Sequence, residues 1–395
     1  MIRTELLVIG GGPAGAALAA LAAGRGIKTL VIERDRFPRD KVCGEFVSAE
    51  GSAVLSRLGV LQEVTAQGAM PMEACLLADA KGRSVEAALP DLPRAGRTAY
   101  GISRAALDQI LLRHADLKGA TVREGWIAMG PELKDGRVTG VTVRPANASD
   151  GVETISAKLV VAADGRRSML QRMLHPAIGD PLATSGKSWF GFKAHFPDRT
   201  GGLDRRIELF VFDGGYAGLG PIEGGRLDLA LIARIDALSA TAKSPQHLFE
   251  ERMLKNPLLA SRLSGEPPCS AWKSIGPLRF NVRTPASHGA MFLGDAAGTI
   301  DPFSGEGISN ALRGAELALP FVERAVAAGG LDAAGERAWS SAWRSAFAPV
   351  TRRARLIGRI FEHPKPASLA MSLLRLPSGA RLLPSLVAAT RTGAV

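Results

Sequence analysis

The fold of this chain is decided by residues 6–33, which read LLVIGGGPAGAALAALAAGRGIKTLVIE. An apolar run, a glycine-rich turn, an alanine-rich segment and a second apolar run follow one another, and this order predicts strand, turn, helix and strand. In this pattern Gly10 makes the tight turn, Gly12 lets the backbone approach a pyrophosphate, and Gly15 lets the helix pack closely on the strand. The phosphates then face unpaired N–H groups at the helix N-terminus, so the stretch predicts a dinucleotide-binding site.

An acidic residue closes the same pattern. Glu33 lies 18 residues after Gly15, near the spacing expected for a carboxylate that accepts a hydrogen bond from a ribose hydroxyl. Because a carboxylate repels a 2′-phosphate, we expect this site to hold a dinucleotide without one, and so not NADP. The residues predicted to bind the dinucleotide here are Gly10, Gly12, Pro13, Ala14, Gly15, Glu33 and Arg34.

Two later segments also read as strands that end in an acid and a glycine. The first is residues 159–168, LVVAADGRRS, with Asp164 at the strand end. The second is residues 289–298, GAMFLGDAAG, with Asp295 after a short buried strand. A further glycine-rich turn follows at residues 299–307 and leads into another predicted helix.

These three elements in this order resemble the flavoprotein hydroxylase superfamily, which includes p-hydroxybenzoate hydroxylase, and its close relatives, the geranylgeranyl reductases. The resemblance spans about residues 5–325 and implies FAD as cofactor. It implies that Asp295 binds the ribityl chain and that Asp164 and Gly165 support the pyrophosphate and the nicotinamide donor. It also implies that the isoalloxazine ring is lined by backbone groups of Gly305, Gly307 and Ile308, with Pro302 as a further cofactor residue.

A basic loop with one thiol follows the second strand. Residues 39–45, RDKVCGE, most resemble the Lys-x-Cys-Gly loop that passes close to the flavin in geranylgeranyl reductases. The resemblance implies that Lys41 faces phosphate or the flavin edge. Two interpretations of Cys43 stay open: a small buried residue packed near the cofactor, or a low-pKa thiol with a catalytic role. Glu45 stands where the reductases usually carry a further glycine.

Residues 101–108, GISRAALD, resemble the G-x-x-R-x-x-L-D segment of flavin hydroxylases, where the arginine heads a helix and touches FAD. Ser103 is predicted to cap a helix over residues 102–117. A cation at a helix N-terminus is unfavourable without a compensating anion, so Arg104 is predicted to be a cofactor residue.

Residues 215–221, GYAGLGP, lie at a predicted strand junction. The reductases tend to carry Tyr-x-Trp-x-Phe-Pro here, but Gly218 replaces the tryptophan and Gly220 the phenylalanine. With Tyr216, this loss of bulk predicts a substrate pocket with room for a flat aromatic ring. The W-x-W-x-I-P pattern of flavin-dependent halogenases is missing from the nearest string, residues 272–277, which disfavours halogenation.

We therefore expect an α/β fold: a GxGxxG Rossmann-type FAD-binding domain with an inserted β-rich substrate domain and a helical C-terminal region. Residue patterns predict a hairpin within residues 72–97, a β-meander at 121–144, strands within 187–235 and a helix over 244–263. The predicted boundaries are 1–71, 98–186 and 275–325 for the FAD-binding domain, 72–97 and 187–274 for the substrate domain, and 326–395 for the helical region.

The arginine-rich C-terminal region has two interpretations. Its helices either cap the substrate cavity or form an interfacial patch that admits a lipophilic substrate from a membrane. The net charge of +11 over 395 residues has three explanations: an arginine-rich proteome, attraction of FAD and NAD(P)H phosphates, or peripheral contact with an anionic membrane. With 5% aromatic residues and no nucleic-acid motif, no nucleic-acid partner is expected.

Three scattered cysteines are too few for a disulfide framework or a zinc site, and the histidines show no metal-ligand spacing. Lys193 and His195, on a predicted strand of the substrate domain, are the candidates worth testing. The first strand begins by about residue 5 and no run of 18 apolar residues occurs, so neither a signal peptide nor a spanning helix is expected. We expect a cytoplasmic protein, and its oligomeric state stays open.

The resemblance implies an FAD-dependent oxidoreductase. The first interpretation is a monooxygenase in which NAD(P)H, a transient reductant without its own Rossmann domain, reduces the flavin, and O2 then serves to hydroxylate a small aromatic or polyketide-like substrate. The alternative is a geranylgeranyl reductase-like enzyme that saturates isoprenoid or lipid C=C bonds. A third is a non-catalytic flavin-binding protein, which the intact flavin motifs disfavour.

Overall fold

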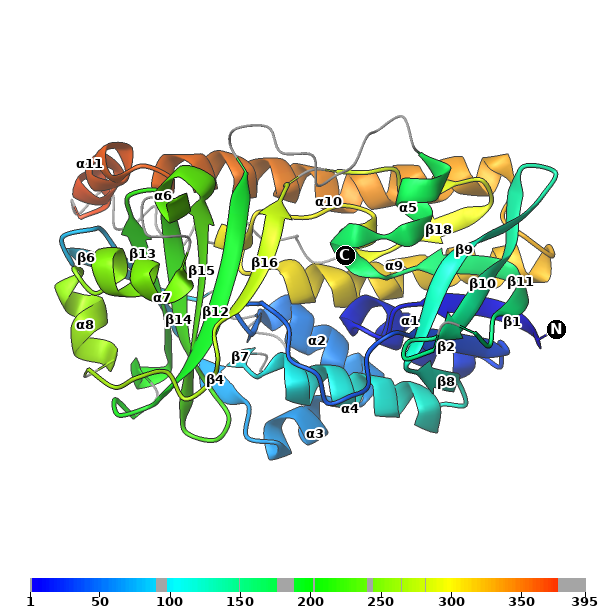
Figure 1. The fold of residues 1–395 in the computed structure, drawn as a ribbon, viewed down its shortest axis with the longest axis horizontal. Coiled ribbons are helices and arrows are strands. Elements are labelled where there is room, and N and C mark those ends of the chain that lie inside the picture. Colours follow the sequence, from blue (N-terminus) through cyan, green and yellow to red (C-terminus); the bar gives the residue numbers. More distant parts are fainter. Residues whose placement is uncertain are drawn as a thin grey trace.

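The computed structural model describes residues 2–89, 98–148, 150–175, 188–201, 203–239, 244–263, 265–280 and 282–375. Part of the predicted helical region, residues 376–395, lies outside this range. The model has the predicted mixed α/β architecture, with a parallel sheet at one end and a second, antiparallel-rich sheet at the other (Figure 1).

The N-terminal stretch folds as predicted. Strand β1 (Ile2–Ile9) leads through the glycine turn into helix α1 (Pro13–Ala23), and β2 (Thr29–Glu33) returns parallel to β1. Nearly every residue of α1 is buried, because alanine and glycine let the helix pack closely between neighbours. On the other side of β1 lies β11 (Glu153–Ala162), also parallel, followed by β18 (Ala290–Phe292).

The predicted meander at residues 121–144 is only partly correct. Strand β8 (Thr121–Glu124) pairs parallel with β2 and so extends the main sheet. Gly125, with φ of +74°, turns the chain away after β8. Strands β9 (Trp126–Lys134) and β10 (Arg137–Pro145) then form an antiparallel hairpin that joins the sheet through β11. The short strand β17 (Ala286–Ser287) pairs with β18.

The second sheet collects strands from distant parts of the chain. Its order is β16 (Lys273–Leu278), β12 (Trp189–Pro197), β15 (Arg226–Arg234), β14 (Gly215–Ile222), β13 (Arg206–Phe212), β5 (Ala74–Ala78) and β6 (Ser84–Ala88). The predicted hairpin is β5 and β6, and it joins the sheet by parallel pairing of β5 with β13. The predicted strand junction at residues 215–221 is wrong, because this segment forms the full strand β14.

Shorter elements accompany the two sheets. A small sheet contains β3 (Phe46–Val47), β7 (Ala99–Gly101) and β4 (Met70–Met72). The predicted helix over 244–263 is broken into α7 (Pro245–Leu248), a π-turn and α8 (Pro257–Leu263), because a proline begins the last piece. The other short helices are α2 (Ala49–Leu58), α3 (Leu61–Ala66), α5 (Met169–Leu174) and α6 (Ile235–Ser239).

Four longer helices complete the fold. Helices α4 (Arg104–Leu117) and α9 (Gly307–Ala327) pack on α1. Helix α10 (Ala333–Phe361) runs past both sheets, and α11 (Pro364–Leu374) lies at the end of the second sheet (Figure 1). Among the described residues, no helix combines the length and the apolar character needed to cross a bilayer.

Candidate functional site

A cavity lies between the carboxyl ends of the parallel strands and one face of the second sheet, which is where ligands bind in open α/β folds. Most residues predicted from the sequence to bind the cofactor meet at its wall, although they come from five separate segments. They are Gly12, Pro13, Ala14, Lys41, Cys43, Arg104, Gly165, Asp295, Pro302, Gly305, Gly307 and Ile308. Two residues predicted to form the substrate pocket, Tyr216 and Gly218, also line it.

Gly10 and Gly15 shape the cavity without lining it. Gly10 has φ of +102°, and a Cβ atom there would lie 2.5 Å from the carbonyl oxygen of Ala163. A Cβ atom on Gly15 would overlap the carbonyl oxygen of Gly10. The tight turn and the close packing of helix on strand therefore have the geometry that the glycine spacing predicted.

Glu33 supports the glycine turn from behind. Its carboxylate accepts hydrogen bonds from the backbone N–H of Gly11 at 2.7 Å and of Asp35 at 2.9 Å. Binding of a ribose hydroxyl by Glu33 stays a prediction. Arg34 and Asp164 are not among the residues that line the cavity: the Arg34 side chain is 72% exposed, and Asp164 accepts the backbone N–H of Met169 at 2.8 Å.

Two arginines face the N-terminus of α1. Arg104 begins α4, where Ser103 caps the helix as predicted by accepting the N–H of Ala106. The anion that compensates Arg104 is Asp108, which binds it through two hydrogen bonds of 2.8 and 2.6 Å. Arg39, which the sequence analysis did not select, places Nη1 at 3.1 Å from the same carboxylate.

This arrangement fits a pyrophosphate. The two guanidinium groups share the buried Asp108 carboxylate, and Arg39 also lies 3.5 Å from the half-exposed carboxylate of Asp35. A Cβ atom on Gly12 would lie 3.6 Å from Arg39 Nη2 and 3.9 Å from Arg104 Nη2, so both guanidinium groups face the glycine turn. Helix α1 has no acidic residue in its first turn. An anionic diphosphate is bound by positive charge, by N–H groups at a helix N-terminus and by a glycine turn that it can approach closely, and all three meet here.

The opposite part of the cavity wall offers backbone instead of side chains. Asp301 caps the short 3-10 turn Pro302–Ser304, and Gly305 follows with φ of +67°. A Cβ atom on Gly307 or on Gly44 would meet no atom within 4 Å, so both glycines border open space. This geometry fits a flat ring system held by backbone groups, as the resemblance implied for the isoalloxazine.

The basic loop with one thiol, residues 39–45, lies along this open space and is called the thiol loop below. Lys41, Val42, Cys43 and Gly44 all line the cavity. The Cys43 sulfur accepts the backbone N–H of Glu45 at 3.4 Å. Burial raises the pKa of the Cys43 thiol above its ordinary value, and this outweighs the opposite effect of the nearby Arg104 guanidinium. A raised pKa disfavours the interpretation of Cys43 as a low-pKa thiol, because such a thiol keeps its proton at neutral pH.

The second sheet closes the cavity with a hydrogen-bonded tyrosine and a glycine. The Tyr216 hydroxyl donates to Asp301 at 2.6 Å, and the ring packs edge-on against Phe303. A Cβ atom on Gly218 would meet only Leu209, at 3.6 Å, so this glycine does leave room. Gly220 does not reach the cavity. A Cβ atom there would meet the Met72 methyl at 3.1 Å, and the glycine instead allows close packing of the small sheet.

From Gly218 the cavity continues over an apolar surface. The walls come from the β5–β6 hairpin, from β13 and from the inner sides of α10 and α11. The residues are Cys75, Leu77, Ala87, Leu89, Ile207, Leu209, Ile357, Phe361 and Leu374. The C-terminal helices therefore do cap the cavity, which is the first of the two interpretations of that region.

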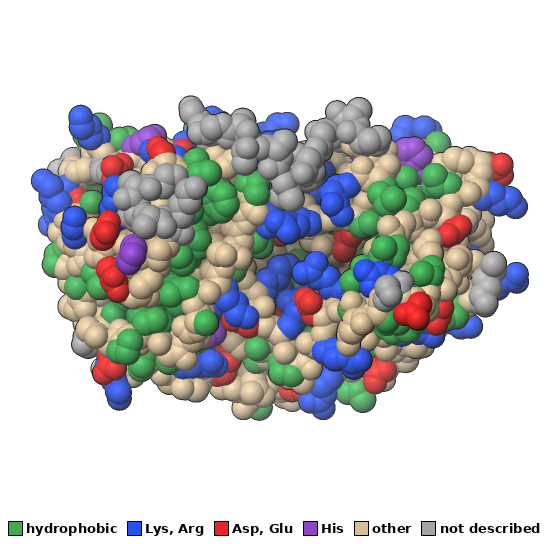
Figure 2. All heavy atoms as spheres, viewed as in Figure 1, with side chains coloured by type: hydrophobic (Ala, Val, Ile, Leu, Met, Phe, Trp, Pro, Cys, Tyr) green, Lys and Arg blue, Asp and Glu red, His purple; other side chains and the backbone are tan. Residues whose placement is uncertain are grey.

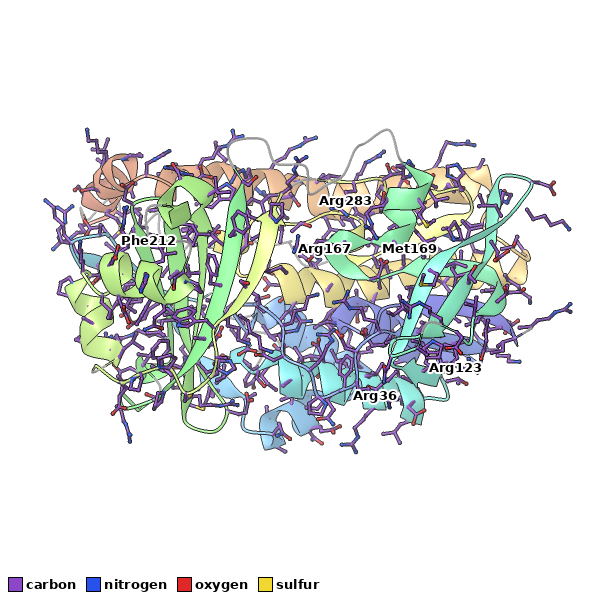
Figure 3. All side chains as sticks on the ribbon, in the orientation of Figure 1. Arg36, Arg123, Arg167, Met169, Phe212 and Arg283 are labelled. Atoms are coloured by element: carbon purple, nitrogen blue, oxygen red, sulfur yellow. The ribbon has the colours of Figure 1, made fainter. Side chains whose placement is uncertain are left out.

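The mouth of the cavity is basic. Figure 2 shows Lys and Arg side chains around a hollow between the two sheets, and Figure 3 places Arg167 and Arg283 there. Arg166 lines the cavity and donates to the carbonyl oxygen of Pro277 at 2.8 Å. Burial lowers the pKa of Arg166 to about 10, so this guanidinium stays charged at neutral pH. Sequence reasoning missed these arginines because nothing in their spacing marks them.

A buried ionic cluster stands behind the thiol loop. Lys193 and His195 of β12 meet Glu45, and His195 Nε2 lies 2.8 Å from Glu45 Oε2 and 3.6 Å from Asp228 Oδ1. Glu45, His195 and Asp228 lie close enough together to hold a metal ion. However, the Lys193 ammonium is only 2.5 Å from Glu45 Oε1, so a cation already occupies that carboxylate.

Curated relatives at 26–27% identity span most of the chain. A menaquinone reductase of Mycolicibacterium smegmatis is 27% identical over 360 residues, covering 86% of this chain and 79% of that protein. A digeranylgeranylglycerophospholipid reductase of Thermoplasma volcanium is 26% identical over 332 residues, covering 78% and 75%. Conditioned medium factor receptor 1 of Dictyostelium discoideum is 26% identical over 330 residues, 80% of this chain, and the chain spans only 62% of its length.

Solved structures share the fold at low identity. The flavin-dependent brominase Bmp2 superposes with a TM-score of 0.79 at 17% identity, covering 98% of this chain and 94% of that one. A probable FAD-dependent monooxygenase of Pseudomonas aeruginosa, pqsL, superposes with a TM-score of 0.69 at 18% identity, covering 92% and 98%. The family model described as an FAD binding domain matches residues 3–320. The chain belongs to this family of FAD-dependent oxidoreductases, as the resemblance to the flavoprotein hydroxylases implied.

Proposed function

We propose that this protein reduces C=C bonds in a long, apolar, isoprenoid-like chain, with FAD as cofactor and NAD(P)H as the transient reductant. The observation that carries the proposal is the apolar surface that runs from the thiol loop past Gly218 to the C-terminal helices. A compact aromatic ring is too short to contact walls as distant as Leu89 and Leu374. A prenyl chain, in contrast, buries its length against them.

The residues suit the cofactor. Gly12, Arg39 and Arg104 would hold its pyrophosphate, Asp295 its ribityl hydroxyls, and the backbone of Gly305 and Gly307 its ring. When bound, FAD supplies the hydride for the substrate carbon and takes it from NAD(P)H. The basic mouth with Arg166 suits the phosphates of that reductant.

The chain itself supplies a proton. Addition of a hydride to a C=C bond requires a proton on the neighbouring carbon. Cys43 lines the cavity and holds a proton on Sγ at neutral pH, because burial raises the pKa of its thiol. We assign Cys43 as the group that donates this proton. The names of the two reductase relatives lend further support.

The hydroxylation of a small aromatic substrate, predicted first from the sequence, is the second candidate. The open space at Gly218 favours it, because a flat ring fits beside that glycine. The sequence predicted room for a ring at both Gly218 and Gly220, but Gly220 lies outside the cavity, so only Gly218 supports this candidate. The oxygen requirement separates the two functions.

The test uses purified protein with FAD, NADH or NADPH, and a prenylated quinone or a free geranylgeranyl chain. We expect a product that gains a hydrogen pair, and we expect it in the absence of O2, as judged by mass spectrometry. A product that forms only in air and carries one added oxygen atom, from a small aromatic substrate, overturns the proposal in favour of the hydroxylase.

We also propose that the outer faces of α10 and α11 contact an anionic membrane, which would supply such a substrate. Large apolar side chains stand exposed there, namely Leu356, Ile360, Leu369 and Leu373. Exposed basic residues lie between and beside them: Arg352, Arg353, Arg359, Lys365 and Arg375. Apolar and basic groups on one face match a lipid surface, and the inner sides of the same helices line the cavity.

We predict that the protein sediments with phosphatidylserine vesicles and less with phosphatidylcholine vesicles. The double substitution Leu356→Ser and Leu369→Ser is expected to weaken this binding about tenfold, because two leucines lose burial in the lipid. Leu117→Ser is the control, since Leu117 is 76% exposed but lies on α4. Unchanged vesicle binding, or loss of self-association instead, contradicts the proposal.

A further inference from the structure

We propose that Lys193 is a positioning residue that closes the thiol loop at both ends and holds it against the cavity. The Lys193 ammonium lies 2.5 Å from Asp40 Oδ1 and 2.5 Å from Glu45 Oε1. It also donates to the carbonyl oxygen of Lys41 at 3.4 Å. One side chain from β12 of the second sheet therefore ties together the two residues that flank residues 41–44, and all four of these enclosed residues line the cavity.

We call the contacts of Lys193 with Asp40 and Glu45 the clamp. Glu45 makes the clamp specific. Its φ of 48° lies in the left-handed region, which favours glycine, so the backbone alone gives no reason for a glutamate. The side chain is fully buried, and both oxygens are occupied. Oε1 accepts the backbone N–H of Arg104 at 2.7 Å as well as the Lys193 ammonium, and Oε2 faces His195. The carboxylate contacts thus offset the backbone strain.

The charges around Lys193 keep the clamp closed. Burial alone lowers the pKa of its ammonium, but the carboxyls of Asp228, Glu45 and Asp40 outweigh this and raise it, so the lysine stays charged. Burial raises the pKa of Asp228 well above its ordinary value, and neither Asp228 oxygen has a hydrogen-bond partner among the described residues.

The clamp ties the cofactor side to the substrate side. Glu45 fixes the backbone of Arg104, and its own N–H donates to the Cys43 sulfur at 3.4 Å. The position of the thiol in the cavity therefore depends on a contact with the second sheet. This inference concerns the loop itself and holds for reduction and hydroxylation alike, so it stands apart from the proposed reaction.

The test measures access to the thiol. In a Cys75→Ser, Cys269→Ser background, the rate of Cys43 alkylation by iodoacetamide is followed across pH 6–9 in the purified protein. We expect Lys193→Met to raise this rate about tenfold or more at every pH, because the unpaired buried carboxylates open the loop. Lys273→Met is the matched control: Lys273 lies 3.4 Å from Asp40 but is half exposed and does not touch Glu45, so no change is expected.

A second variant covers the case in which Lys193→Met does not fold. The triple substitution Asp40→Asn, Glu45→Gln and Lys193→Met removes all three charges, so it avoids an uncompensated buried charge. We expect it to fold and to keep the fast alkylation. Glu45→Gly relieves the backbone strain but removes the clamp, and is also expected to be fast. Rates equal to that of the background protein in the triple and Glu45→Gly variants overturn the proposal, because the backbone alone would then hold the loop.

Discussion

Replacing Cys43 by serine is expected to lower the rate of product formation about 100-fold or more, while the flavin stays bound. The reason is that a serine hydroxyl is a far weaker acid than a thiol, and loss of a positioned proton donor costs about 10²–10⁴ in rate. Arg104 and Asp295, two of the residues that would hold the cofactor, are themselves unchanged in this variant. The rate is measured as saturated product per bound flavin, with reduction of the flavin by NAD(P)H followed separately by its absorbance.

The control is Cys269→Ser. Cys269 is exposed and is not among the residues that line the cavity, so its replacement is expected to leave the rate within about threefold. If Cys43→Ser keeps a near-native rate, the thiol is a packing residue. If that rate also yields a hydroxylated product, the first sequence-based interpretation takes the place of the reductase.

Replacing Asp108 by asparagine is expected to lower the free energy of unfolding of the FAD-free protein by about 3–5 kcal/mol. Asp108 is fully buried and is the carboxylate that Arg39 and Arg104 share. Without it, Arg104 loses both hydrogen bonds to its carboxylate partner, and Arg39 is left with the half-exposed Asp35 at 3.5 Å. FAD is expected to restore part of the loss, because its pyrophosphate brings negative charge to the same place.

Urea denaturation with and without FAD measures this effect. The control is Glu316→Gln, which removes the partner of Arg57 in an exposed pair with hydrogen bonds of 2.7 and 2.6 Å. That change is expected to cost at most about 1 kcal/mol, since exposed ion pairs contribute little. A loss for Asp108→Asn no larger than for Glu316→Gln, or an equal gain from FAD in both variants, contradicts the proposed pyrophosphate cradle.

The sequence by itself determined the FAD-binding fold. The patterns that allowed this are local: Gly10 and Gly15 act on neighbours within a few residues, and the alternation of apolar and glycine residues is readable in short windows. The Ser103 cap and the β5–β6 hairpin are local for the same reason. The resemblance added the distant motifs at Asp164 and Asp295, which no single window connects.

Local patterns failed where strand identity depends on a neighbour. Residues 215–221 carry three glycines and a proline, which normally mark a turn, yet they form β14 because β13 and β15 pair with it on both sides. Likewise β8 belongs to the parallel sheet because β2 offers a free edge. These pairings are long-range hydrogen bonds, and local propensity is weak against them.

Only the tertiary structure decided which charges meet. Arg39 and Arg104 are distant in sequence, as are Glu45, Lys193 and Asp228, and no spacing rule relates them. The structure also showed that the anion beside Arg104 is the protein's own Asp108, and that Gly220 packs against Met72 instead of opening the cavity. Buried charge and packing depend on what surrounds a side chain in three dimensions, and the chain order alone does not contain that information.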